Sequence, residues 1–333
     1  MRVCVLLILF AFVLQPVSAQ KKKTTTAPTT TKTQGGRVGA SSSKKVAPRV
    51  ASAAAAARSL RILTRAGATI WLDEVRRGTT GADGVLELKN VTSGRHTLRV
   101  RAKGFQERTL ALAPTQRGQI DVPLKPTTDE AELAFQEAEE ASGRATDDAA
   151  REQAVELYRR ALSLRPRYPE AHVALARLLL ALGRTDDALD EIEAARRDRP
   201  IYPEASAVEG RILRAAADEE AAIEAYRRAI REGRGFQPEA YAGLGIALEE
   251  RGDYAGATEA FRKAIAQLSD TEPALYQLLG ATYEKLEKWK EALAAYEKYL
   301  ALAPEGRFAS AIRSIIDQLR IQAAEQESAP PIP

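Results

Sequence analysis

Small and bulky apolar residues recur along the C-terminal part of the chain with a period of 34 to 35 residues. The tripeptide Pro-Glu-Ala begins at Pro169, Pro203 and Pro238, and Pro273 continues the series with Pro-Ala-Leu. Before, between and after these prolines a small residue is followed four positions later by a bulky apolar one, in the pairs Ala154 and Tyr158, Ala188 and Ile192, Ala222 and Tyr226, Ala257 and Phe261, and Ala292 and Tyr296. A fixed period of this length predicts stacked supersecondary units, which typically present a surface to partners and do not catalyse reactions.

Each unit is expected to form two helices that pack as a hairpin. The first helix begins at the proline, where the missing N–H group costs nothing. The second helix ends at Pro166, Pro200 or Pro304, because proline cannot continue it. Glycine at positions such as Gly245 and Gly280 lets the two helices touch, and bulky residues fill the space beside that contact.

This pattern resembles the tetratricopeptide repeat. The resemblance implies an α-solenoid of about five repeats over residues 129–304, in which the first helices line a concave groove. A capping helix is expected over residues 305–324, followed by a disordered tail over 325–333. The apolar stripe that docks the capping helix consists of Phe308, Ile312, Ile315, Ile316 and Leu319.

The groove is the candidate binding site for a protein or peptide partner. Residues of the first helices that are not needed for packing change from basic to acidic along the array. We therefore expect an extended or helical peptide whose charges run in the opposite direction. The candidate groove residues are Val173, Arg177, Leu180, Arg211, Arg214, Ile246, Glu249, Glu250, Gln277, Glu284 and Lys285.

Residues 59–126 show a period of two in place of the helical period. Leu98 and Val100 alternate with Arg99 and Arg101, and glycine-containing turns separate this run from similar ones. Such alternation predicts half-buried antiparallel strands, and several short strands suggest a small all-β sandwich. Trp71 lies in one of these strands and is expected in the core.

The same segment resembles the bacterial PEGA module in Gly67-Ala68, Ile70 to Asp73, Gly78 to Thr80, Gly94 to His96 and Gly104-Phe105. The Pro-Glu half of the family's namesake motif is replaced here by Arg65-Ala66. Asp83-Gly84 and Gly104-Phe105 equally resemble carboxypeptidase regulatory-like domains. Both resemblances imply a non-catalytic accessory module on an exported or membrane-linked protein.

The N-terminus has the layout of a secretory signal, with an apolar run from Val3 to Leu14 and a small-residue cleavage site after Ala19. We expect a signal peptide over residues 1–19 and a periplasmic or extracellular protein. Lys21 to Lys23 directly follow the cleavage site, so an uncleaved membrane anchor stays open as the alternative. Residues 20–58 form a Thr/Ser/Ala-rich segment with nine Lys or Arg and no acidic residue, which predicts a disordered basic linker.

Nothing in the chain predicts an enzyme. There is no P-loop, dinucleotide fingerprint or zinc spacing, and no cofactor, metal or nucleic-acid ligand is expected. His96 and His172 are each interpreted as structural. The sequence thus predicts an exported non-enzymatic scaffold or adaptor; the alternative is a cell-envelope assembly factor whose β domain and basic linker contact peptidoglycan or an anionic membrane.

Overall fold

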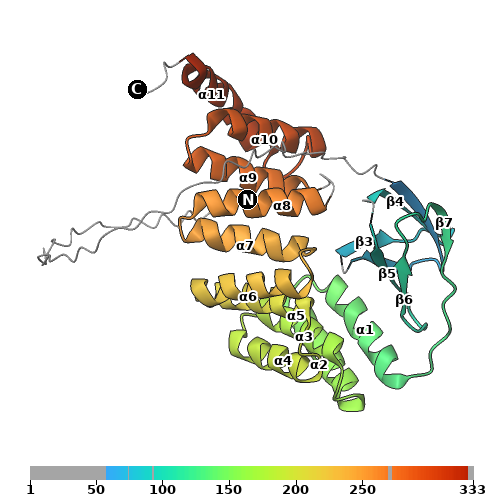
Figure 1. The fold of residues 1–333 in the computed structure, drawn as a ribbon. Coiled ribbons are helices and arrows are strands. Elements are labelled where there is room, and N and C mark those ends of the chain that lie inside the picture. Colours follow the sequence, from blue (N-terminus) through green and yellow to red (C-terminus); the bar gives the residue numbers. More distant parts are fainter. Residues whose placement is uncertain (1–57, 74, 92–93, 269–271, 329–333) are drawn as a thin grey trace, which may run out of the picture. The chain divides into compact units, whose positions relative to one another are not determined.

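The computed structural model describes residues 58–73, 75–91, 94–268 and 272–328. The predicted signal peptide, nearly all of the basic linker and the last residues of the predicted tail lie outside these ranges. Seven strands come first along the described chain, and a series of helices follows (Figure 1). The predicted fold class, a small all-β sandwich followed by an α-solenoid, is confirmed.

Two sheets share one apolar core in the sandwich. The first sheet has the order β4-β1-β7, formed by Val85–Val91, Arg58–Leu63 and Gly118–Asp121. The second has the order β3-β2-β5-β6, formed by Val75–Thr79, Thr69–Leu72, His96–Arg101 and Arg108–Leu112. The strand pairs are antiparallel, as predicted, except that β1 and β7 run parallel.

The alternation of side chains in β5 places its residues on opposite faces of the second sheet. Leu98 and Val100 are fully buried against the first sheet, whereas Arg99 and Arg101 point to the outer face. One turn between β3 and β4 requires glycine. Gly84 has φ of +73°, and a Cβ atom there would collide with the carbonyl oxygen of Thr64.

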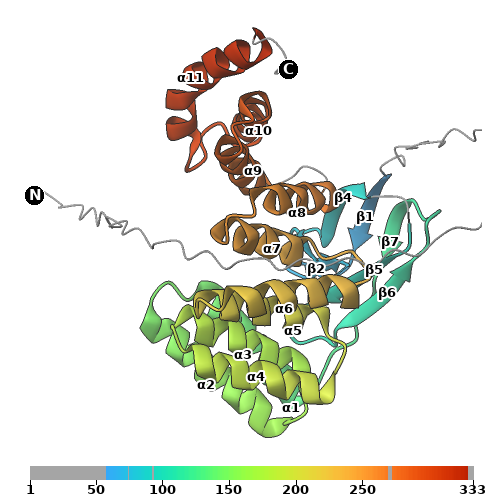
Figure 2. The same cartoon turned by 60° about the vertical axis from the view of Figure 1, so that its left-hand side comes forward.

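Helices α1 to α10 form five antiparallel pairs that follow one another along the chain, as both views show (Figures 1 and 2). The pairs are α1 (Glu130–Arg144) and α2 (Asp148–Leu164), α3 (Pro169–Ala181) and α4 (Thr185–Asp198), α5 (Pro203–Ala215) and α6 (Glu219–Glu232), α7 (Pro238–Glu250) and α8 (Tyr254–Gln267), and α9 (Pro273–Lys285) and α10 (Trp289–Leu302). Each of α3, α5, α7 and α9 begins with its proline, as the repeat pattern predicted.

Close contact within each hairpin explains the alternation of small and bulky residues. A Cβ atom on Gly245 would lie 2.5 Å from Cε1 of Phe261, and one on Gly280 would lie 2.6 Å from Cε1 of Tyr296. Gly210 faces the ring of Tyr226 in the same way. An aromatic ring in the second helix thus leaves no room for a methyl group on the first.

The last helix, α11 (Ala309–Ser328), packs against α10. Ile312, Ile316 and Leu319 of the predicted stripe are buried, and Ile312 and Leu319 belong to a cluster with Tyr296 and Tyr299. Phe308 and Ile315, which were expected in the same stripe, are 37% and 36% exposed. The buried face of α11 is therefore narrower than the sequence pattern suggested.

Candidate functional site

A cavity of about 1020 Å³ lies between the outer face of the second sheet and the first helices of the repeats. Its sheet side includes Thr69, Trp71, Arg76, Arg99, Arg101 and Lys103, which we call the sheet wall. Its helical side includes Glu170, Arg177, Tyr202, Glu204, Glu239, Ala242 and Glu272, which we call the repeat wall. Helix α1 closes one end with Phe135, Gln136, Glu139 and Glu140.

Trp71 lies at the centre of the sheet wall and not in the core where it was expected. Its neighbours Ile70 and Leu72 occupy the inner face of β2, so the residue between them must point outward. The guanidinium carbon of Arg99 lies 4.6 Å from the centroid of the Trp71 ring, and that of Arg101 lies 5.5 Å away. The sheet wall therefore presents an aromatic ring in contact with two cations.

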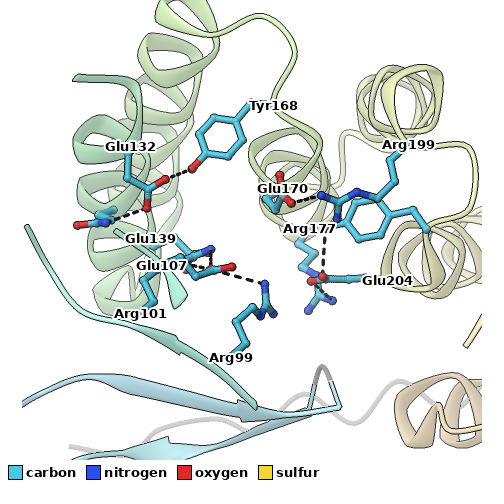
Figure 3. A network of polar contacts seen from close by, with 12 residues as sticks. Arg99, Arg101, Glu107, Glu132, Glu139, Tyr168, Glu170, Arg177, Arg199 and Glu204 are labelled. Atoms are coloured by element: carbon cyan, nitrogen blue, oxygen red, sulfur yellow. Dashed lines mark hydrogen bonds and ion pairs between the residues drawn. The ribbon is translucent and has the colours of Figure 1, made fainter. Parts of the chain in front are cut away.

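Arg101 joins the sheet to the first repeat. Its guanidinium group forms ion pairs with Glu107 at 2.6 Å and Glu139 at 2.7 Å, and lies 4.6 Å from the ring centroid of Phe135. Figure 3 shows Arg99 and Arg101 projecting from the sheet toward these carboxylates. Burial alone would lower the pKa of Arg101, but the surrounding carboxylates raise it above its ordinary value, so the group stays charged.

Gln136 of α1 makes the second link between the sheet and the repeats. Its Oε1 atom accepts from the backbone N–H of Gly104 at 2.8 Å, and its Nε2 atom donates to the carbonyl oxygen of Phe105 at 2.9 Å. Only 6% of Gln136 is exposed. Lys103 and Glu140 add an ion pair at 2.5 Å nearby. These contacts fix the loop after β5 to the first repeat helix.

The repeat wall is built from the glutamates of the Pro-Glu-Ala motifs. Arg177 donates to Glu204 at 3.1 Å and lies 3.5 Å from Glu239 (Figure 3 shows the first of these pairs). Arg211 also pairs with Glu239. An arginine of one repeat thus meets the motif glutamate of the next repeat, and the expected basic end of the groove is neutralised by acidic partners.

Of the predicted groove residues, Arg177 lines the cavity and the others lie elsewhere. Val173 is 1% exposed and belongs to the core of the first repeats. Leu180 is half-buried against the same core, and Ile246 is half-buried against the core of the later repeats. The remaining residues lie farther along the array. Arg214 pairs with Glu250 at 2.8 Å, and Glu284 accepts from the hydroxyl of Tyr296. Glu249 and Gln277 are half-buried, and Lys285 is exposed.

Residue burial also affects the acidic end of the predicted groove. Burial raises the pKa of Glu249, and the charge of Glu250 adds to this effect, while Lys285 opposes it. The predicted residues therefore divide into those that form ion pairs or hydrogen bonds within the array and those that lie singly outside the cavity. The sheet wall and the motif glutamates were not among them, although the outward arginines of β5 and the repeated glutamate were both visible in the sequence.

Both histidines have structural partners. Nδ1 of His96 lies 2.5 Å from Oδ2 of Asp73, and Asp73 also accepts from the N–H of Thr97. Nδ1 of His172 lies 2.5 Å from Oε2 of Glu191. Within the part of the chain that the structure describes, no group of three or more His, Cys, Asp or Glu side chains is arranged to hold a metal ion.

These features define a helical-repeat protein of the kind typical of protein–protein interaction scaffolds. Comparison with sequence families matches the tetratricopeptide repeat at residues 145–212, 208–273 and 274–327. Residues 145–327 therefore are tetratricopeptide repeats, as the resemblance implied. These matches do not include the sandwich, and a search of curated proteins found no match.

Solved structures show the same fold for the helical part. The structure of PilW, a widely conserved type IV pilus biogenesis factor, has a TM-score of 0.52 and 17% identity; the similarity covers 61% of this chain and 92% of PilW. The structure of PilF from Pseudomonas aeruginosa has a TM-score of 0.50 and 18% identity, covering 59% of this chain and 87% of PilF. At this level of identity the similarity concerns the fold alone.

Proposed function

We propose that this protein is a non-catalytic adaptor that binds a segment of a partner protein in the cavity between the sheet wall and the repeat wall. The observation that carries the proposal is the cavity itself, because first helices of consecutive repeats and the half-buried Trp71 line it together. Its volume of about 1020 Å³ is at the upper end of the range for ligand sites. Tetratricopeptide repeats are generally scaffolds, and none of the family matches is catalytic.

Site-specific crosslinking in cells tests this placement. A photo-crosslinking amino acid at Ala242, which lines the cavity, should capture a partner. The same group at Glu193, which is exposed on the second helix of another repeat, is the matched control and should capture none. Equal capture at both positions, or capture at Glu193 alone, would refute binding in the cavity.

Charge reversal of Arg177 or Arg211 is a weaker test than the sequence suggested. A carboxylate at either position would face Glu239, and at Arg177 also Glu204, so it would disturb the contact between repeats. Loss of a partner in such a variant would report an altered array as well as an altered ligand site. Ala242 avoids this ambiguity because its side chain makes no polar contact.

We further propose that the protein is exported and that its sandwich is a PEGA-like accessory module. The signal-like N-terminus and the motifs of the sandwich support this. Within the described residues, no helix has both the length and the apolar character needed to cross a membrane. Sequencing the N-terminus of the mature protein tests export with cleavage, and a chain that still begins at Met1 would contradict it.

The alternative of an envelope assembly factor depends on the basic linker, whose residues 20–57 carry eight Lys or Arg and no acidic residue, since the ninth, Arg58, is buried in β1. Such a segment is attracted to anionic surfaces. Sedimentation of the full chain with purified peptidoglycan or with anionic vesicles, compared with neutral vesicles, tests this role. Equal sedimentation in all three would rule it out.

A further inference from the structure

Most charged side chains that line the cavity pair with charges of the protein itself. The pairs are Arg101 with Glu107 and Glu139, Lys103 with Glu140, Glu170 with Arg199, Glu204 with Arg177, and Glu239 with Arg211. These charges hold elements of the protein together, so they do not select a charged ligand. The chemistry that the cavity offers to a partner must come from its uncharged lining.

The ion pairs between neighbouring first helices stop at α7. An arginine at the ninth position of α3 or α5 pairs with the motif glutamate at the second position of the next first helix. The corresponding residues are Ile246 at the ninth position of α7 and Ala274 at the second position of α9. The step from α7 to α9 therefore presents uncharged residues where the earlier steps present an ion pair.

An uncharged surface occupies this step. Ala242 and Ile246 lie one turn apart on one face of α7, and Ala274, Gln277 and Ala281 share one face of α9 by the same helical spacing. Ala242 and Ala274 line the cavity, while Ile246, Gln277 and Ala281 are half-buried. We call this set of residues the neutral strip.

Charged residues border the neutral strip and stay in water. Glu272, directly before α9, and Lys285, at the end of α9, are both exposed. The lining of the cavity beside the strip continues with Leu268 and Leu275. The strip is therefore an apolar surface with small side chains, at which a ligand side chain leaves water without meeting a charge.

We infer, building on the proposed function, that the neutral strip anchors the partner through an uncharged segment that carries bulky apolar side chains. Such side chains gain free energy by leaving water against Ala242, Ile246 and Ala274. A lysine or glutamate in the same place would lose its water beside residues that cannot pair with it. The cavity volume of about 1020 Å³ suits a chain segment of this kind and excludes a folded domain.

Blocked synthetic peptides test the chemistry of this site. Each twelve-residue peptide has a Gly-Ser background with acetylated and amidated ends, and carries leucine, lysine or glutamate at the same three central positions. Titration calorimetry with the full chain should show that the leucine peptide binds at least about tenfold more tightly than either charged peptide. Its affinity should change by less than about twofold between low and high salt, because no charge is involved. Absence of leucine-peptide binding, or equal or tighter binding of a charged peptide, would overturn the inference.

A double variant places charges on the neutral strip. Ile246→Arg combined with Ala274→Glu introduces the residue types of the earlier repeats without changing the net charge, and should weaken leucine-peptide binding by at least about tenfold. The matched control is Ile321→Arg combined with Ala266→Glu, which makes the same substitutions at exposed positions of α11 and α8 and should leave binding unchanged. Unchanged binding in the strip variant, or an equal loss in the control, would overturn the inference. Ile246→Asn replaces the double variant if thermal unfolding shows that the latter is not folded, and it should weaken binding by at least about threefold.

Crosslinking separates failure of this inference from failure of the proposed function. A crosslinker at Ala242 should capture the partner in the otherwise unchanged chain, and capture should fall to background when Ile246→Arg and Ala274→Glu are added. Capture that persists in the combined variant would overturn the anchoring role of the neutral strip and leave the adaptor function standing. Absence of capture in the otherwise unchanged chain would overturn both.

Discussion

Replacing Gln136 by leucine should loosen the connection between the sandwich and the repeats. The substitution removes the acceptor of the Gly104 N–H and the donor to the Phe105 carbonyl, and leaves both half-buried groups without these partners. A buried backbone group without its partner costs about 1 to 3 kcal/mol. Two such groups, partly reached by water, predict a local destabilisation of about 2 to 4 kcal/mol.

Amide hydrogen exchange measures this effect at the affected bond. The protection of the Gly104 amide should fall by at least about 30-fold in Gln136→Leu, since about 1.4 kcal/mol corresponds to a factor of ten. Gln119→Leu is the matched control, because the exposed Gln119 side chain contacts Asp121 at the surface and its loss should stay within about 0.5 kcal/mol. Unchanged protection of Gly104 would show that Gln136 does not hold the joint and would refute the reasoning.

Three further predictions concern the repeats. Gly245→Ala should destabilise the protein by about 1 to 3 kcal/mol in denaturant unfolding, because the new methyl group meets the buried ring of Phe261. The control Gly143→Ala places its methyl group in open space and should be neutral or stabilising. Ala217 has φ of +59° where the repeats before and after it have Gly183 and Gly252, so Ala217→Gly should raise stability by about 0.5 to 1 kcal/mol; a decrease would contradict this. Burial alone would lower the pKa of His172, but its hydrogen bonds and the charge of Glu191 raise it. The stability that protonated His172 contributes is therefore complete below about pH 6.5 and is lost as pH rises through the raised pKa. The free energy of unfolding of His172→Gln, measured from pH 6 to 8, should lack that loss.

The repeat array was predictable because its determinants are local and recur. Proline at the start of a first helix and the small residue opposite an aromatic ring each act within one hairpin. Gly210, Gly245 and Gly280 show the same close approach in three successive units. A pattern that satisfies the same steric condition several times leaves few alternative folds.

The sandwich was predicted as a class, but several of its strands were not recognised. β1 begins with Arg58, a buried arginine whose guanidinium donates to the carbonyl oxygens of Ala113, Pro114 and Gln116. A charged residue at an inward position breaks the apolar alternation that marks a strand. The contacts that compensate its burial come from residues more than fifty positions away, so they are not visible locally.

The position of Trp71 could not be derived from residue type alone. Large aromatic residues are often buried, and this preference favoured a core position. The strand register decides otherwise, because Ile70 and Leu72 occupy the inward positions on either side. That the tryptophan lines the cavity depends on the outer face of the sheet lying opposite the repeats, which is a tertiary property.

The arginines of the predicted groove were visible in the sequence, but their role becomes clear only from the glutamates with which they pair. Arg177 is followed 27 residues later by Glu204, and Arg211 is followed 28 residues later by Glu239; both pairs form in the structure. In the next unit the corresponding positions are Ile246 and Ala274, so the arginine and the glutamate are lost together. A ligand-binding arginine would have no reason to disappear with a glutamate of the following repeat. The paired loss instead indicates that these charges join neighbouring repeats.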